Sequence, residues 1–274
     1  MTGAGAGRLI VCPTPIGNLE DVTLRTLSVL READVIACED TRTTKVLLDR
    51  YAVNAPRVRY DAHAERRVAP KLVERMLAGE TVALVSDAGM PLVSDPGLVL
   101  VQAAAAAGLA VEVLPGPSSA LTAIVASGLP AETWRFVGFL PRKRGELEVV
   151  LASEETLVAF ESPKRVPATL AVLAELDPER AVAVCRELTK VYEEIVRGSA
   201  AVLAERYAGA EVRGEVVLVI AGAEPGAGDA ASAQAAVRRL VDAGAKPRVA
   251  AVVVAELTGL AANDLYRAAV AGRD

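Results

Sequence analysis

The sequence predicts an α/β protein with two domains and a small helical appendage at its C-terminal end. Short apolar, β-branched segments alternate with segments of helical periodicity from residue 8 onward. Such alternation is typical of βαβ units and a mostly parallel sheet. The pattern breaks at 128–134, and strand-like segments continue beyond it with fewer helices between them. We therefore expect a first domain at 8–128 with a parallel-rich sheet and a second at 129–223 with a mixed sheet.

Each element of the first domain has a local signal. A helix is expected to begin near Asp21 as its N-cap, because Leu24, Leu27 and Leu30 recur every three residues as a buried stripe. Gly79 provides the stop of a later helix. The expected strands are 9–12, 34–38, 57–60, 81–85 and 110–114, and the other helices are 44–51, 70–78 and about 97–107.

The second domain and the appendage follow the same logic. The expected strands are 136–139, 157–160, 181–185, 193–197 and 215–221, with helices at 166–175 and 200–207. Residues 224–230, EPGAGDA, have the composition of a linker. Residues 231–274 form a helical appendage, and the stretch TGLAAND resembles the connection of a helix-turn-helix. The appendage is expected either to dock on the rest of the protein as a structural cap or to contact nucleic acid.

One loop organises the chain, the stretch VSDAGMPLVSDPG at 85–97. Two further polar loops, at 39–43 and 115–119, also follow predicted strands. Because the carboxyl ends of parallel strands share one edge of a sheet, the three loops should meet where open α/β sheets bind ligands. The alternative is a long connection whose aspartates are simply solvated.

Composition narrows the function classes. With 52% hydrophobic and 24% charged residues, the chain has the content of an ordinary folded protein. A net charge of −5 argues against a general polyanion binder, and 3% aromatics argue against a surface that stacks many bases. The three cysteines are far apart and the one histidine is alone, so we expect free thiols and no metal site. The absence of a signal peptide or membrane-spanning stretch predicts a cytoplasmic location.

Several long segments resemble the tetrapyrrole-methylase superfamily, and more narrowly its ribosomal branch, the 16S rRNA cytidine 2′-O-methyltransferases. They are PTPIGNLEDVTLRTL, CEDTR, VSDAGMPLVSDPG, PGPSSALTAIVASGLP and GFLPRK, followed in the second domain by FESPKR and RELTKVYEEIVRG. The resemblance runs from about Leu9 to Gly222. It departs from the usual pattern in the central loop, where Met90 stands in place of a threonine.

This resemblance implies two α/β domains with S-adenosylmethionine bound in the cleft between them, in a homodimer. Ser118 and Ser119 begin a helix, where backbone N–H groups and hydroxyls can meet a polar ligand or serve only as an N-cap. The residues that the resemblance places at the cofactor are Ile16, Asp87, Gly89 and Met90 in the first domain, and Ser162 and Ala221 in the second.

The expected chemistry is methyl transfer to a ribose 2′-hydroxyl. Displacement at a sulfonium needs no metal, but a weakly acidic hydroxyl calls for a general base or an electrostatic stabiliser. The catalytic candidates are Glu39, Asp40, Arg42 and His63, with Glu187 and Lys190 across from them. Helix capping by the carboxylates and an ordinary structural histidine remain the alternatives.

The expected substrate is a decoding-centre cytidine of 16S rRNA in the small ribosomal subunit. Five cations would form a basic edge for its phosphates, namely Arg142, Lys143, Arg144, Lys164 and Arg165, unless they are merely solvated linker charges. Two other functions stay open: a tetrapyrrole methyltransferase and a non-catalytic ribosome-binding protein. The PTPIGN loop and the appendage count against the first, and the retained cofactor loops count against the second.

Overall fold

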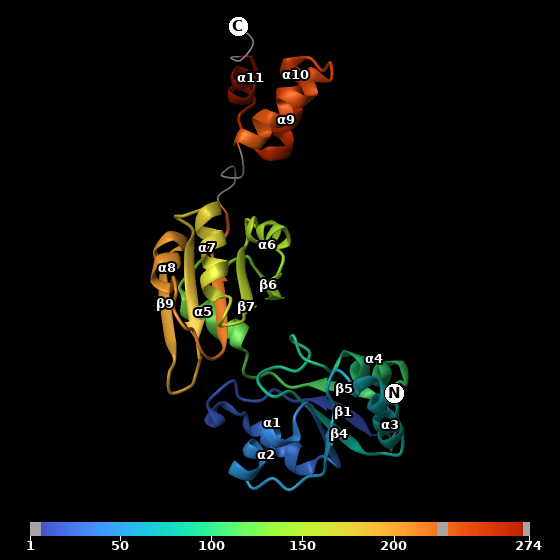
Figure 1. Cartoon of the computed structure of the whole chain (residues 1–274). Coiled ribbons are helices and arrows are strands. Elements are labelled where there is room, and N and C mark those ends of the chain that lie inside the picture. Colours follow the sequence, from blue (N-terminus) through green and yellow to red (C-terminus); the bar gives the residue numbers. More distant parts are fainter. Residues whose placement is uncertain (1–6, 224–229, 271–274) are drawn as a thin grey trace.

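A computed structural model describes residues 7–223 and 230–270, and it confirms the α/β class (Figure 1). The N-terminal sheet has five parallel strands in the order β3-β2-β4-β1-β5. Its strands are β1 (Arg8–Val11), β2 (Val35–Cys38), β3 (Arg57–Arg59), β4 (Thr81–Val85) and β5 (Ala110–Val113). Its helices are α1 (Leu24–Glu32), α2 (Thr41–Arg50), α3 (Glu65–Leu77) and α4 (Leu98–Ala106).

Alternate strand residues build the two cores of this unit. Leu9 and Leu84 pack with α3 and α4 on one face, whereas Ile10 and Ala83 pack with α1 and α2 on the other. Strands buried on both faces explain why these segments read as continuous apolar runs. The result is a three-layer sandwich whose strands all end at the same edge.

The second sheet is mixed, as predicted, and has the order β6-β7-β10-β8-β9. Only β6 and β7 run parallel, and the other pairs are antiparallel. Its strands are β6 (Trp134–Phe139), β7 (Thr156–Glu161), β8 (Ala181–Arg186), β9 (Glu194–Ser199) and β10 (Val216–Ile220). The helices around it are α5 (Ser119–Ser127), α6 (Arg144–Leu151), α7 (Val166–Leu176) and α8 (Ala200–Tyr207).

Helix α5 lies before the predicted domain boundary but packs on the second sheet. Its side chains Ala120, Ala123 and Ile124 share a core with β7, β8 and β10, while α6, α7 and α8 cover the opposite face. We therefore propose that the second unit begins at α5 and not at residue 129.

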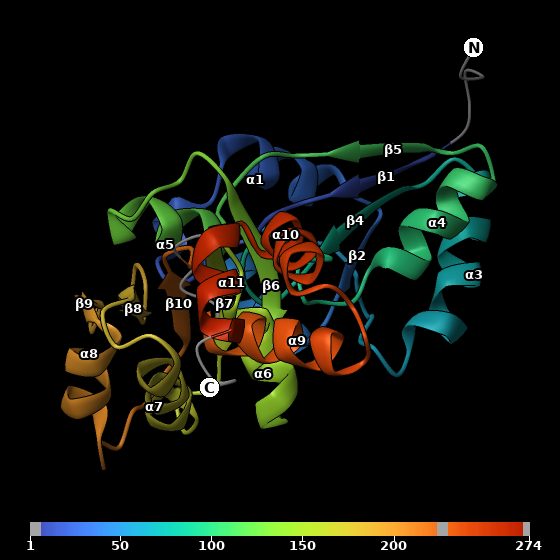
Figure 2. The same ribbon diagram turned by 90° about the horizontal axis from the view of Figure 1, so that it is seen from above.

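The C-terminal helices α9 (Ala230–Asp242), α10 (Pro247–Thr258) and α11 (Ala262–Val270) pack on one another (Figure 2). Their small core includes Val237, Val254 and Leu265. Apart from Ala230, the predicted linker lies outside the described residues, as do 271–274 of the appendage. Within 7–223 and 230–270, no helix is long and apolar enough to cross a membrane.

Three local predictions were wrong. Helix α1 begins at Leu24 with Thr23 as its N-cap, and not near Asp21, because residues 19–21 form a separate 3-10 turn. Leu24, which was expected in the buried stripe, is 83% exposed. Helix α3 begins before Pro70, since burial of Val68 and Ala69 holds the preceding turn helical despite the lost backbone bond. Helix α6 was not predicted; it begins at Arg144 with Lys143 as its N-cap, so the charged stretch at 142–144 leads directly into a helix.

Candidate functional site

A cavity of about 440 Å³ lies between the two α/β units. The carboxyl ends of β4, β6 and β7 reach it, as does the start of β10, which runs antiparallel to β7. The first unit and the start of α5 contribute Ala88, Gly89, Met90, Val93, Ser94, Asp95, Ser118 and Ser119. The second unit contributes Phe139, Phe160, Glu161, Ser162, Pro163, Gly214, Glu215, Val216 and Val217.

Most of the cofactor residues expected from the sequence reach this region. A second cavity of about 360 Å³ adjoins the first, because Ala88 and Glu215 line both. The larger cavity receives Gly89, Met90, Ser118, Ser119 and Ser162, and the smaller one receives Ile16 and Asp87.

Ala221 is the one expected cofactor residue that the structure does not bring to either cavity. Strand β10 begins at the large cavity with Val216 and runs away from it, so Ala221 lies beyond the far end. Its carbonyl oxygen instead accepts a hydrogen bond from Arg180 Nε at 2.5 Å. The part of β10 that lines the cavity is Val216 and Val217.

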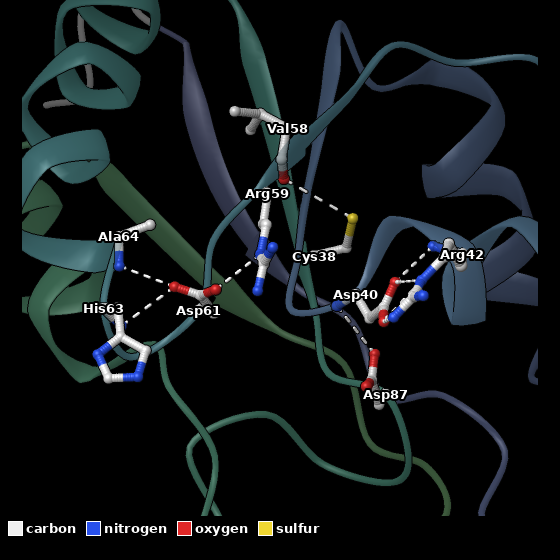
Figure 3. Close-up of polar contacts among 9 residues, drawn as sticks. All are labelled: Cys38, Asp40, Arg42, Val58, Arg59, Asp61, His63, Ala64 and Asp87. Atoms are coloured by element: carbon white, nitrogen blue, oxygen red, sulfur yellow. Dashed lines mark hydrogen bonds and ion pairs between the residues drawn. The ribbon is translucent and has the colours of Figure 1, made fainter.

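Short backbone contacts hold the predicted loops together. The N–H of Thr14 donates to the Gly89 carbonyl at 2.9 Å, and the Gly89 N–H donates back to Thr14 at 3.0 Å. The Asp40 N–H donates to Asp87 Oδ1 at 3.1 Å, which ties the loop after β2 to the loop after β4 (Figure 3). The loops after β1, β2 and β4 therefore form one connected surface at the sheet edge.

The expected carboxylate pair divides into two different environments. Asp40 caps α2 and forms an ion pair with Arg42, whose hydrogen bonds hold the pKa of Asp40 well below its usual range. Glu39 is half-buried, and burial followed by the charges of Asp95 and Asp87 raises its pKa. Neither carboxylate nor Arg42 lines the two cavities. Asp40 is the N-cap of α2, and Arg42 is its ion-pair partner within the helix.

His63 is exposed and lies after β3, the outermost strand of the first sheet. Its backbone N–H donates to Asp61 Oδ1 at 3.1 Å, and Figure 3 shows its imidazole pointing away from Asp40 and Asp87. The structure does not bring this side chain to either cavity.

Asp95 lines the cavity but was not among the site residues predicted from the sequence. It is the second aspartate of the central loop, and the Ser86 hydroxyl lies within hydrogen-bonding reach of its carboxylate. Burial, followed by the charge of Asp87, raises the pKa of Asp95 to about 6. A carboxyl group with such a pKa can take up a proton near neutral pH.

The two units touch beside the smaller cavity. A Cβ atom on Gly17 would lie 2.9 Å from the Leu188 carbonyl oxygen, and the Asn18 N–H donates to Thr189 Oγ1 at 3.0 Å. Lys190 lines the smaller cavity and pairs with Glu187 at 2.8 Å and Glu215 at 3.0 Å. Of the two residues expected across from Glu39, Asp40, Arg42 and His63, Lys190 lines the smaller cavity, and Glu187 is held beside it by their ion pair.

Gly89 offers a test of the close packing at the site. It has φ = +77°, and an added Cβ would lie 3.3 Å from Ile16 Cγ2. We expect Gly89→Ala to raise the dissociation constant for the cofactor several-fold, measured by calorimetry, because Ile16 must shift. Gly108→Ala is the matched control, since Gly108 has φ = +71° and nothing within 4 Å of the added atom. If both variants weakened cofactor binding equally, the loss in Gly89→Ala would be due to backbone strain and not to the contact with Ile16.

The predicted basic edge is only partly available to a ligand. Lys143 pairs with Glu146 at 3.0 Å, and Arg144 pairs with both Glu148 and Glu175. Arg165 donates to the carbonyl oxygens of the loop that follows β6. In the part of the chain that the structure describes, Arg142 and Lys164 are exposed and have no ion pair.

The larger cavity fits a ligand with an apolar ring and a polar end. Its size lies in the range of small-molecule sites, which is about 300–1,000 Å³. Met90, Val93 and Val217 provide apolar surface, and the first turn of α5 presents hydroxyl and N–H groups. Gly89 allows the backbone to approach closely. Among the described residues, no group of three or more His, Cys, Asp or Glu could hold a metal ion.

The fold and this cleft define a member of the tetrapyrrole-methylase class. The family model described as Tetrapyrrole (Corrin/Porphyrin) Methylases matches residues 8–204. Among similar solved structures, uroporphyrin III C-methyl transferase from Thermus thermophilus is 24% identical with a TM-score of 0.57, over 78% of this chain and 97% of that one. That enzyme is also known complexed with S-adenyl homocysteine. Diphthine synthase is 14% identical with a TM-score of 0.61, over 78% of this chain and 90% of that one.

Curated relatives narrow the family. Ribosomal RNA small subunit methyltransferase I of Mesorhizobium japonicum is 44% identical over 267 residues, which is 94% of this chain and 90% of the relative. The protein of the same name from Bacillus subtilis is 43% identical over 220 residues, 79% of this chain and 75% of the relative. The chain therefore belongs to the ribosomal RNA small subunit methyltransferase I family, and it is an S-adenosylmethionine-dependent methyltransferase.

Proposed function

We propose that the chain methylates the ribose 2′-hydroxyl of a decoding-centre cytidine in 16S rRNA of the small ribosomal subunit. The observation that carries the proposal is identity of 44% over 94% of the chain to a relative named for small-subunit rRNA methylation. The proposed location is the cytoplasm, where such a substrate is found.

The larger cavity is the proposed binding site of S-adenosylmethionine. Met90, Val216 and Val217 would pack against its apolar ring, and Ser118 and Ser119 would meet its polar groups. Asp87 lines the adjoining cavity, but one of its oxygens already holds the Asp40 N–H, so it would contribute chiefly its second oxygen. When bound, the cofactor supplies an electrophilic methyl group.

Asp95 is the proposed general base. A 2′-hydroxyl is a weak acid, so its attack is faster when a carboxylate accepts the proton. Asp95 lines the cavity, and its raised pKa makes it a stronger base than an exposed aspartate while leaving it mostly ionised at neutral pH. With cofactor and acceptor bound, the cavity walls would align the reacting groups and limit water between them, which would contribute much of the acceleration.

A homodimer is the proposed assembly. Leu24, Val113, Leu121 and Val125 are 83, 57, 53 and 82% exposed. They lie on α1, β5 and α5. Large exposed apolar side chains are available to a protein interface. Light scattering of the purified chain at micromolar concentration should give twice the mass of the monomer, and a monomeric mass would count against this assembly.

The function is tested by transfer of a radiolabelled methyl group to purified small subunits that lack the modification. Naked 16S rRNA is assayed in parallel, and nuclease mapping locates the product. Label at one cytidine whose 3′ linkage resists alkaline cleavage is the expected result. No label on either RNA from a protein that binds S-adenosylmethionine would reject the proposal and favour a tetrapyrrole acceptor.

The two unpaired cations should contribute to RNA binding. We expect Arg142→Ala with Lys164→Ala to weaken binding to small subunits at least tenfold and to reduce the salt dependence, since each lost phosphate contact changes the logarithmic slope by roughly 0.7–0.9. Lys143→Ala with Arg144→Ala removes the same charge from residues already paired with glutamates, and it should have a smaller effect. Equal losses in both double variants would indicate that only net charge matters.

A further inference from the structure

All three phenylalanines of this aromatic-poor chain gather beside the larger cavity. The ring of Phe160 lies 5.0 Å from that of Phe136 and 5.6 Å from that of Phe139, both in edge-to-face geometry. Phe139 and Phe160 line the cavity. Although the sequence contains few aromatic residues, its phenylalanines are therefore concentrated at the site.

An irregularity in β6 gives Phe139 its direction. In a regular strand, residues 136 and 139 would face opposite sides of the sheet. Phe136 pairs with Val158 and Phe139 with Phe160, so the register shifts by one residue between them, and Gly138 adopts φ = +64°. This bulge places both rings on the face of Phe160. Bulges commonly re-aim a side chain next to a functional site.

Phe139 remains 62% exposed, whereas Val217, which also lines the cavity, is 5% exposed. The Ser94 hydroxyl lies 3.4 Å from the position of an added Cβ on Gly138, so the segment bearing Asp95 borders this rim. The two unpaired cations are close to these residues in sequence, because Arg142 follows Phe139 by three residues and Lys164 follows the cavity residues Ser162 and Pro163. The cavity thus combines an exposed ring with a carboxylate, and free cations follow two of its lining segments along the chain.

We propose that Phe139 forms the stacking surface for the unpaired base of the acceptor nucleotide, a subsite that is separate from the buried, cofactor side of the cavity. The inference rests on the proposed function. A base extruded from its stack needs an aromatic or apolar surface in the enzyme, and phosphates need nearby cations. Stacking on Phe139 would hold the ribose of the same nucleotide beside Asp95.

The test uses full-length protein with Phe139→Ala and Phe139→Trp, and with Val149→Ala as a control at a 76% exposed position on α6. Stacking on an aromatic ring is worth roughly ten- to a hundredfold in affinity. We therefore expect Phe139→Ala to weaken binding of small subunits by about that factor while the dissociation constant for S-adenosylmethionine stays constant. Phe139→Trp and Val149→Ala should bind like the original protein.

Fluorescence gives a readout that is independent of methyl transfer. In a Trp134→Phe background, which removes the one native tryptophan, Phe139→Trp should be quenched by unmodified small subunits and not by S-adenosylmethionine alone. Quenching by cofactor alone, or weaker cofactor binding in Phe139→Ala, would overturn the inference and assign the ring to the cofactor. Unchanged subunit affinity in Phe139→Ala would also overturn it. If the original protein methylates no RNA, the proposed function fails by that separate measurement.

Discussion

Asp95→Asn is expected to lower the rate of methyl transfer by roughly 10²–10⁴-fold, the usual contribution of a general base. The amide keeps the shape of the side chain but cannot accept the proton at neutral pH. The dissociation constant for S-adenosylmethionine should change little, so the loss should appear in kcat. Single-turnover transfer to unmodified small subunits is the appropriate measurement, because it isolates the chemical step from product release.

The pH profile distinguishes a base from a residue that only shapes the cavity. Because the pKa of Asp95 is about 6, the rate of the original protein should fall below that pH as the carboxylate becomes protonated, and it should level off above it. Asp95→Asn should lose this acidic limb. His63→Ala is the control, since His63 is exposed outside the cavity, and it should keep both the rate and the limb. The opposite pattern in the two variants would transfer the role of base to His63.

Stability supports the interpretation of that variant. The folded-state pKa of Asp95 is raised above the value of an unfolded chain, which is about 3.9. The folded state therefore binds the proton more tightly, and the ionised carboxylate opposes folding at neutral pH. Asp95→Asn should leave the thermal midpoint equal or higher at pH 7, so a loss of activity would not be explained by unfolding.

The fold could largely be predicted because strands buried on both faces appear in the sequence as continuous apolar runs. Ala83 and Leu84 point to opposite cores, so their strand reads as one apolar run between a glycine and a polar loop. Helix α6 gave no such signal, since only Leu147 and Leu151 are buried in it and its first residues are charged. The position of α5 could not be predicted either, because an apolar helix face does not show in the sequence which of two sheets it will cover; α5 packs on the second.

The candidate site was predictable at the level of loops but not of individual atoms. Strand order alone brings the loops after β1, β2 and β4 to one edge. The position of Asp95 in the cavity depends on a loop in which Leu92 and Ser94 adopt φ values of 72° and 69°. Neither leucine nor serine favours this conformation, so the sequence does not predict it. The direction of Phe139 depends on a bulge, whose register shift follows from pairing with β7 and not from local sequence.

Arg180→Met is expected to lower the free energy of unfolding by about 3–5 kcal/mol, more than the other substitutions considered, because it leaves buried carbonyl oxygens without a hydrogen-bond donor. Arg180 is only 6% exposed, and it donates to the carbonyl oxygens of Leu151, Ser153 and Ala221 at 2.5–3.0 Å. These carbonyls belong to the end of α6 and to the residue after β10, so one side chain joins three segments of the second unit. Methionine fills similar volume but provides no donor.

Thermal unfolding followed by circular dichroism should show a midpoint lower by roughly 10 °C for Arg180→Met. Arg197→Met is the matched control, because Arg197 also donates to carbonyl oxygens, those of Ala126 and Ser127, but is exposed. Water can replace its hydrogen bonds, so that variant should lose less than about 1 kcal/mol. Similar losses in the two variants would mean that the number of hydrogen bonds, and not their burial, determines the contribution of arginine in this unit.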